Sequence, residues 1–539
     1  MHSLLWPGDG PAPVQPPALS DQAMRDLELD ALADLLARDR PEVRGYAWRL
    51  LAHLPQDVAT SAWRGAVTAD LLASARLYDG LEAAARQLRI LAQHRPERFP
   101  AEVGRAARIG ARVVELRTYL ETLETLAEAL GGPGVRAPGL LALRSDVEAV
   151  LGTPAVVELG RELPRLSARL DSVRSITIAV NVNDALEPES AVLVGFSDHQ
   201  VGPESSALLR FTHDTGQRRP VRLFRRTPVD WQGQDPTVQA VLALLEAVAT
   251  PVEGALHRFR TVRSQELAHL EEEIWLLLGA VRLAREWQAH GLPCAVAEVT
   301  AEGEWLAEEA FHPVLARRLP RAGDMTCNPV RFGPAGTVWV LTGPNRGGKT
   351  TYLRACGVVQ VLGQCGLPVP ARSARLQPVS HLFTHFPAPE AAEPGRGRLD
   401  EEAERLGGIF RTCAPGDMVL LNEVLAGTSA TEGVALAADV LRGLALARCR
   451  ALYTTHLHEL AAQAEQLGRD DGGPCPLGCL TVQTVLDRSV APPVRRPTYR
   501  VLPGVPEGAS FFASAIAQRH GVSLPQITAL LRERGLLPT

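Results

Sequence analysis

The chain has 539 residues, a formal net charge of −5, 46% hydrophobic residues and 22% charged residues. This composition is that of a folded protein with about two to four domains, and it excludes a disordered chain. No stretch of roughly eighteen uncharged apolar residues is present, which argues against a membrane span. The net charge gives no general attraction to nucleic acid, so DNA binding would depend on local basic patches.

The N-terminal segment is rich in proline, and its short apolar run has no basic region ahead of it. It predicts a flexible tail over residues 1–20 rather than a signal peptide. The eight cysteines are scattered, and only Cys475 and Cys479 lie close together, which is weak support for a zinc site. We therefore expect reduced thiols and a cytoplasmic location.

The pattern of apolar residues changes three times along the chain. Ala, Leu, Arg and Glu recur at helical spacing over residues 21–175, which predicts a helical core. The β-rich runs SITIAVNVN and AVLVGF predict a small β element over 176–232. Helical spacing returns over 233–318, a predicted lever region with a kink or break at Pro251. Strands and helices then alternate over 319–539, which is typical of an α/β nucleotide-binding domain. The predicted fold class is therefore α+β and multidomain.

A glycine-rich loop follows the first strand of the α/β part. It fits G-x-x-x-x-G-K-[ST], and it lies between an apolar β-rich run and a helix-compatible stretch. Lys349 is the only lysine among 56 lysine and arginine residues. An ammonium group fits a cradle of backbone amides beside the phosphates, whereas a guanidinium is planar and larger. The predicted nucleotide site consists of Gly343, Pro344, Asn345, Gly347, Gly348, Lys349, Thr350 and Thr351.

Polar residues end two further apolar strands. The run from Met418 to Leu421 is followed by Asn422 and Glu423. A carboxylate in this place can orient the water that attacks a γ-phosphate, so Glu423 is the candidate base; a cap of a helix or strand is the alternative. ALYTTHLHEL contains another strand that ends at His456. This histidine is either a γ-phosphate sensor or a structural residue.

These motifs resemble the ATPase domain of the MutS family of DNA mismatch-repair proteins, an ABC-type P-loop ATPase. The family loop G-P-N-x-G-G-K-[ST]-T matches residues 343–351, T-S-x-x-[DE]-G matches 428–433, and T-H-x-x-E-L matches 455–460. Further similar segments are FHPVL, CNPVRFGP, GRGRLDEEAERLGGIF and EGASFFASAIA. The strong resemblance covers about residues 305–535.

The resemblance implies a homodimer that binds ATP and Mg²⁺ and couples ATP hydrolysis to DNA binding in repair or recombination. Repair-pathway proteins would be its further partners. It implies that Thr350 and Asn422 contact the metal, that Asn328 lies near the adenine, and that C-terminal helices dimerise. Gly397, with Arg398 beside it, falls where the family has a serine that reaches the γ-phosphate of the partner.

Three departures limit this transfer. Asn422 stands where the family has a Walker B aspartate, and Gly397 stands where it has the serine. None of the twelve phenylalanines is followed by Glu two residues on, so the Phe-x-Glu wedge that reads mismatches is missing. We expect an N-terminally shortened member of the family that does not read mismatches with this wedge.

The densest basic stretch is GQRRPVRLFRR, which is either a set of DNA phosphate contacts or a solvated loop. Its arginines are Arg218, Arg219, Arg222, Arg225 and Arg226.

The alternative function is a nucleotide-gated scaffold that binds ATP with little hydrolysis and acts through protein partners. Asn422 and Gly397 favour that alternative. An ABC transporter subunit is disfavoured, because the sequence has no LSGGQ-like signature and no membrane segment.

Overall fold

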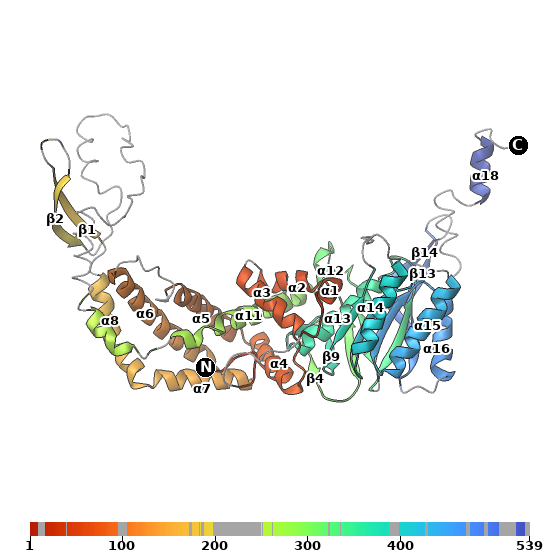
Figure 1. Cartoon of the computed structure of the whole chain (residues 1–539), viewed down its shortest axis with the longest axis horizontal. Coiled ribbons are helices and arrows are strands. Elements are labelled where there is room, and N and C mark those ends of the chain that lie inside the picture. The colour runs from red at the N-terminus through yellow and green to blue at the C-terminus, as the bar shows by residue number, and fades with distance from the viewer. Residues whose placement is uncertain are drawn as a thin grey trace. The chain divides into compact units, whose positions relative to one another are not determined.

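The structure is a computed structural model in which two compact units are distinguished (Figure 1). The first unit contains Met1, 79–133 and 143–271, and the second contains 2–78, 134–142 and 272–539. The structure describes residues 1–8, 17–38, 40–94, 105–171, 175–182, 184, 188–197, 250, 252–260, 262, 264–321, 324–334, 336–387, 398–425, 430–470, 475–489, 494–505 and 524–533. No helix in these ranges has both the length and the apolar composition that crossing a membrane requires.

The first unit is mainly helical. It contains all of α6 and α8 and parts of α5, α7 and α11, and α6 packs against α8. Arg112 and the buried Glu115 of α6 form an ion pair with 2.6 Å between Nη1 and Oε2. The short 3-10 helices η3 and η4 interrupt the helix that the sequence predicts for this part of the chain. The bounds are α5 (Ala75–Gln93), α6 (Arg105–Leu130), α7 (Pro138–Leu151), α8 (Pro154–Asp171), η3 (His257–Phe259), η4 (Ser264–Leu267) and α11 (Leu270–Ala289).

The predicted β element is present as a hairpin. Strand β1 (Ser175–Val182) pairs antiparallel with β2 (Pro188–Ser197), and the register shifts twice along the pair. These are the two strands that the alternating runs predict. The rest of the predicted element, including the five arginines of the basic stretch, lies outside the described residues, as does Pro251.

Four N-terminal helices belong to the second unit and not to a separate helical core. Helix α1 lies against strand β10, and α4 lies against helix α13 of the α/β part. The predicted boundary at residue 175 therefore differs from the division of the chain into compact units. Helical spacing indicates a helix but not the core against which that helix packs. The bounds are α1 (Asp21–Asp26), α2 (Leu29–Ala37), α3 (Pro41–Ala52) and α4 (Val58–Ala73).

The prediction of a flexible tail is wrong for residues 2–6. Ser3 Oγ donates to Glu273 Oε1 at 2.7 Å, and the backbone N–H of Leu4 donates to Glu273 Oε2 at 2.8 Å. The guanidinium of the fully buried Arg64 lies 4.0 Å from the ring centroid of Trp6. The apolar run that resembled part of a tail is therefore buried in the second unit, while residues 9–16 lie outside the described ranges.

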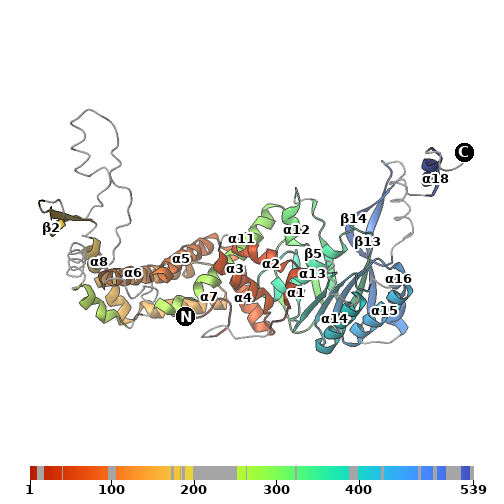
Figure 2. The same cartoon turned by 45° about the horizontal axis from the view of Figure 1, so that its top comes forward.

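The second unit contains a six-stranded sheet in the order β10-β11-β12-β7-β13-β14. Neighbouring strands are parallel, except that β14 runs antiparallel to β13. The alternate side chains of β11, Val419 and Leu421, pack in one core with α14, α15 and α16, and Figure 2 shows these helices together beside the sheet. The bounds are β7 (Thr337–Thr342), α13 (Lys349–Gln364), β10 (Leu382–His385), α14 (Arg398–Thr412), β11 (Met418–Asn422), α15 (Ala430–Leu446), β12 (Arg450–Thr455), α16 (His458–Asp470), β13 (Leu477–Asp487) and β14 (Val494–Pro503).

A second, smaller sheet has four strands in the order β4-β9-β5-β6, and β3 pairs with β8. Trp305 of β5 donates from Nε1 to Gln360 Oε1 of α13 at 2.6 Å, so the small sheet is tied to the helix after the glycine-rich loop. The observed mixture of helices and mixed sheets agrees with the predicted α+β class. The remaining bounds are β3 (Ala295–Val296), β4 (Glu298–Val299), β5 (Trp305–Ala310), α12 (Pro313–Arg318), β6 (Asn328–Phe332), β8 (Pro368–Val369), β9 (Ser373–Leu376) and α18 (Leu524–Glu533).

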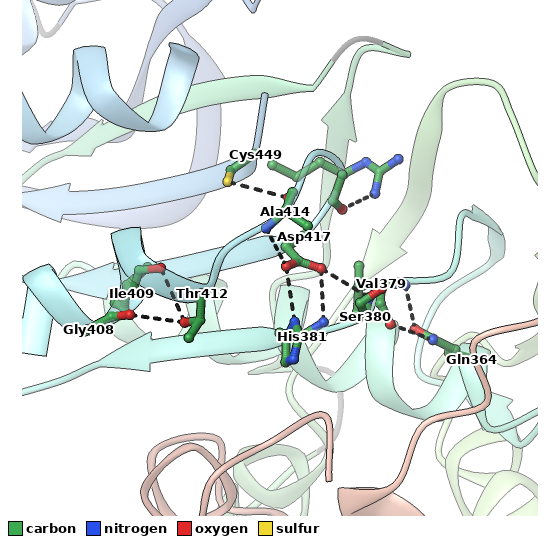
Figure 3. A network of polar contacts seen from close by, with 12 residues as sticks. Gln364, Val379, Ser380, His381, Gly408, Ile409, Thr412, Ala414, Asp417 and Cys449 are labelled. Carbon is green, nitrogen blue, oxygen red and sulfur yellow. Dashed lines mark hydrogen bonds and ion pairs between the residues drawn. The ribbon is translucent and has the colours of Figure 1, made fainter. Parts of the chain in front are cut away.

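A buried aspartate aligns the amino ends of two parallel strands. Asp417, one residue before β11, accepts from the backbone N–H groups of Ser380 and His381 at 3.0 and 2.9 Å (Figure 3). It also accepts from the N–H of Ala414 at 2.9 Å. Hydrogen bonds to an ionised acceptor are stronger than neutral ones. Asp417 therefore holds β10 and β11 in a register that brings His385 level with Leu421 at the opposite edge.

Glu273 makes the stability of the second unit depend on pH. Burial raises the pKa of its carboxyl to about 7, although the hydrogen bonds from Ser3 and Leu4 lower it. In the unfolded chain the same carboxyl loses its proton near its ordinary value of 4.5. The unfolded state therefore binds fewer protons between these values, and the free energy of unfolding falls as the pH rises from about 4.5 to about 7.

We expect Glu273→Gln to remove this contribution, which is about 3–4 kcal/mol at most because one pKa unit corresponds to about 1.4 kcal/mol. Urea unfolding at pH 5 and pH 7.5 measures it, and the partly exposed neighbour Glu272, changed to Gln, serves as the control. Equal pH dependence in the wild type and Glu273→Gln would show that the buried carboxyl does not titrate in this range.

Candidate functional site

The glycine-rich loop joins β7 to α13, as the sequence predicts. Gly348 is the N-cap of α13 and has a φ of +90°, a conformation that glycine adopts without steric cost. A Cβ on Gly343 would lie 2.8 Å from the Cβ of Val482, and a Cβ on Gly347 would lie 2.8 Å from the carbonyl oxygen of Pro344. The glycines are therefore needed both for the turn and for the close approach to β13.

Lys349 lies at the centre of this loop with only 5% of its surface exposed. Its Nζ donates to the carbonyl oxygens of Gly343 and Pro344 at 3.0 and 3.3 Å. The Oε1 atom of Glu423 is 3.6 Å from the same nitrogen. Burial lowers the pKa of the ammonium, and the nearby carboxylate acts in the opposite direction. The structure thus brings together the predicted phosphate ligand and the predicted base.

Asn422 connects the loop helix to two strands. Its Oδ1 accepts from the hydroxyl of Thr350 at 3.0 Å and from the hydroxyl of Thr454 at 2.8 Å. These residues come from the first turn of α13 and the carboxyl ends of β11 and β12. Parallel neighbours bring their carboxyl ends to one edge of a sheet, which explains why polar residues far apart in the sequence meet here. The predicted metal pair, Thr350 and Asn422, is therefore in direct contact.

A cavity of about 730 Å³ opens beside the loop. This volume is within the range of about 300–1,000 Å³ that is usual for small-molecule sites. The lining includes polar residues of the loop together with Glu423. It also includes the apolar and aromatic side chains of Phe311, Leu315, Leu319, Met325 and Tyr499. The cavity therefore combines groups compatible with phosphates and groups suited to a planar ring.

Asn328 borders the cavity, but its carboxamide has a structural role. Its Nδ2 donates to the carbonyl oxygen of Tyr499 at 2.9 Å, and its Oδ1 accepts from the N–H of Val501 at 2.8 Å. Both polar ends of the side chain thus hold β14 against β6. Tyr499, which has a φ of +61°, is fixed beside Gly348 in this way. The role of Asn328 near an adenine stays a prediction.

Other predicted residues lie apart from the cavity or outside the described ranges. His456 is exposed, follows the end of β12 and is not part of the cavity lining. Arg398 is the first residue of α14, whereas Gly397 lies outside the described residues. Sequence patterns did not select Met325 or Tyr499, because neither belongs to the loop or to a strand that ends at the phosphate edge.

Residues 339–470 match the family model of MutS domain V. This match supports membership of the MutS family. The match begins within β7 and ends with α16, so it contains the loop, Asn422 with Glu423, and His456. MutS domain V is the ATPase and DNA-binding region of the MutS-family mismatch-repair proteins, whose members bind DNA and act as dimers. The resemblance predicted from the sequence motifs is thus confirmed.

The contacts of Lys349 predict that arginine cannot replace it. A guanidinium cannot occupy the space between the two loop carbonyls and Glu423 with the same geometry, because it is larger and planar. We expect Lys349→Arg to weaken ATP binding more than tenfold, which corresponds to about 1.4 kcal/mol. Titration with a fluorescent ATP analogue measures the Kd.

The control is Arg346→Lys, the reverse exchange at an exposed position of the same loop, which should change the Kd by a few fold at most. Near-normal affinity in Lys349→Arg would mean that the single lysine of this chain is an accident of composition.

Proposed function

We propose that this chain binds ATP in the cavity beside Lys349 and hydrolyses it, and that it couples hydrolysis to DNA binding in repair or recombination. One observation carries the proposal. The buried Lys349 and the carboxylate of Glu423 lie 3.6 Å apart in the lining of a nucleotide-sized cavity. The match to MutS domain V supports the same function.

In this proposal the phosphates occupy the loop, and the adenine packs against apolar and aromatic residues of the cavity lining. The backbone amides of residues 343–351 and the positive end of α13 attract the phosphates. Lys349 supplies a positive charge from within the loop. Met325 and Tyr499 line the cavity, and their side chains can pack against an adenine ring. Specificity for ATP over other anions then depends on the apolar lining as well as on the loop.

The residues present fit Mg²⁺. The hydroxyl of Thr350 and the Oδ1 of Asn422 are neutral oxygen atoms 3.0 Å apart at the edge of the loop. Mg²⁺ prefers oxygen ligands and usually keeps waters and substrate phosphates in its shell, so one or two protein ligands suffice. Thr350 and Asn422 would hold the ion, and its charge would offset the negative charge that develops during hydrolysis.

Glu423 is proposed to orient the attacking water. Its side chain lines the cavity and is 33% exposed, so water can reach it. In the structure the carboxylate faces Lys349, which holds it at the phosphate end. His456 is proposed to respond to the γ-phosphate from the end of the adjacent strand β12. A side chain at the end of a loop after a strand can approach a bound phosphate when the domain closes.

DNA binding and dimerisation are proposed from the family. Members of the MutS family bind DNA and act as dimers. The five arginines between residues 218 and 226 are proposed as contacts to DNA phosphates, which give affinity without base specificity. Gly397 and Arg398 are proposed to approach the ATP of a second copy. Because no Phe-x-Glu motif is present, the DNA ligand is proposed to be duplex or branched DNA rather than a mismatch read by a wedge.

Asn422 favours a second candidate, a nucleotide-gated scaffold with little hydrolysis. An aspartate would add a full negative charge near Mg²⁺, whereas the asparagine is neutral. Its Oδ1 already accepts from the hydroxyls of Thr350 and Thr454. The metal would therefore be held more weakly than by a charged side chain, and turnover would be slow.

Asn422→Asp distinguishes the two candidates. Both threonine hydroxyls can still donate to the aspartate, so the fold should be retained while the charge at the metal increases. We expect turnover to rise, by about tenfold for each 1.4 kcal/mol of transition-state stabilisation recovered. Steady-state phosphate release is measured against Mg²⁺ concentration for the wild type, Asn422→Asp and the inactive reference Glu423→Gln.

A wild type no faster than Glu423→Gln, with tight ATP binding, supports the scaffold and contradicts the hydrolase. If Asn422→Asp is no faster than the wild type at any Mg²⁺ concentration, the asparagine does not limit the reaction.

The missing wedge predicts weak discrimination of mismatches. Affinity for a G·T mismatch should equal that for a perfect duplex within a few fold, and binding should weaken steeply with salt, as phosphate contacts require. Fluorescence anisotropy at several salt concentrations, with and without ATP, measures both. A large preference for the mismatch at constant salt would reveal another kind of reader.

A further inference from the structure

The turn after β11 has a backbone conformation that is unfavourable for its residues. Glu423 has a φ of +51° and Leu425 has a φ of +63°. Residues other than glycine, and bulky ones in particular, rarely adopt this left-handed region. Such a conformation persists only where surrounding contacts determine it, and it is frequent at functional sites. The question is which contacts hold this turn.

Three consecutive residues of the turn are each fixed by one hydrogen bond. The N–H of Glu423 donates to the carbonyl oxygen of Thr454 at 2.9 Å. The carbonyl oxygen of Val424 accepts from the Tyr453 hydroxyl at 2.6 Å. The N–H of Leu425 donates to Glu402 Oε2 at 2.8 Å. The first two partners belong to β12 and the third belongs to α14. Hydrogen bonds from β12 and α14 thereby hold the main chain at Glu423 and at the two residues after it.

Glu402 and Tyr453 are buried where they make these bonds. Glu402 is 6% exposed and Tyr453 is fully buried. A buried carboxylate or hydroxyl that lacks a partner destabilises a protein, so the bond to the turn satisfies both sides of each contact. Burial, and after it the nearby charge of Glu402, raises the pKa of the Tyr453 hydroxyl. The hydroxyl therefore stays protonated and donates a hydrogen bond to the carbonyl oxygen of Val424.

We propose that Glu402 and Tyr453 are positioning residues that hold Glu423 towards Lys349 and the phosphate end of the cavity. This inference rests on the proposed hydrolysis of ATP, in which Glu423 orients water. Neither residue lines the cavity, so neither contacts the nucleotide. Their effect is on the direction of the Glu423 side chain, which the left-handed turn sets. Helix α14 thus helps to orient Glu423, the proposed base, which directly follows strand β11.

The test compares the variants Glu402→Ala, Glu402→Gln and Tyr453→Phe. Glu402→Ala removes the acceptor of the Leu425 N–H, and Tyr453→Phe removes only the donor to Val424 while the ring is kept. Misplacement of a reacting group by about 1 Å can cost about a hundredfold in rate, so we expect kcat to fall by at least about tenfold in both. The KM for ATP and the Kd of a non-hydrolysable analogue should change by less than about threefold, because Lys349 and the loop are untouched.

Two further variants separate positioning from a general loss of structure. Glu402→Gln keeps an oxygen that can accept from Leu425, so it should recover most of the kcat that Glu402→Ala loses. Glu401→Ala makes the same chemical change one residue earlier on α14, at a partly exposed position, and should leave kcat unchanged. Unchanged kcat in both Glu402→Ala and Tyr453→Phe, or equal loss of affinity and kcat, overturns the proposal.

Hydrogen exchange gives a readout that does not depend on hydrolysis. The amides of residues 423–425 should exchange faster in Glu402→Ala than in the wild type, while those of α13 should not change. Protection that stays the same in 423–425 contradicts positioning by Glu402. A wild type that binds ATP but releases no phosphate overturns the proposed function instead, and the exchange experiment still decides whether Glu402 holds the turn.

Discussion

The buried charge of Lys349 is the constraint on which the arrangement of the site depends. An ammonium group removed from water is stable only where hydrogen-bond acceptors and an opposite charge surround it. Here the carbonyl oxygens of Gly343 and Pro344 supply the acceptors, and Glu423 supplies the opposite charge. The loop must therefore turn these carbonyls towards the ammonium group, and the turn after β11 must present a carboxylate to it. The glycines permit the first condition, and the left-handed turn at Glu423 provides the second.

The sheet brings these parts into reach of one another. In the parallel register Asn422 pairs with Thr454, and Thr454 pairs with Leu341, so β11, β12 and β7 end within one residue of one another at the edge where the loop begins. At the opposite edge of the sheet, Asp417 accepts hydrogen bonds from the main chain just before β10. It thereby fixes the register between β10 and β11. A slip by one residue would reverse the faces of the side chains, because their period along a strand is two. Register is thus as important to this site as the identity of its residues.

The helix that begins at Lys349 also carries contacts to the N-terminal helices of the same unit. Arg354 donates from Nε to the carbonyl oxygen of Asp26 at 2.7 Å, and its Nη1 lies 3.0 Å from Glu28 Oε1. Asp26 in turn accepts from the hydroxyl of Thr384 on β10 at 2.7 Å. The loop helix, the first helices of the chain and the edge of the sheet are therefore parts of one packed unit, and the match to MutS domain V covers only residues 339–470 of it.

The sequence alone determined the local features of this protein. The glycine-rich loop, the lysine in it and the polar ends of β11 and β12 follow from spacing along one segment, and each was predictable from residues close in sequence. Tertiary structure decided the rest. The burial of Trp6, the use of the Asn328 carboxamide by β14 and the bond from Glu402 to the turn beyond Glu423 all join residues far apart in the sequence. Periodicity records which face of a helix or strand is apolar, but the partner of a buried polar group is fixed only when the chain packs, because its hydrogen bonds depend on distances that no local pattern contains.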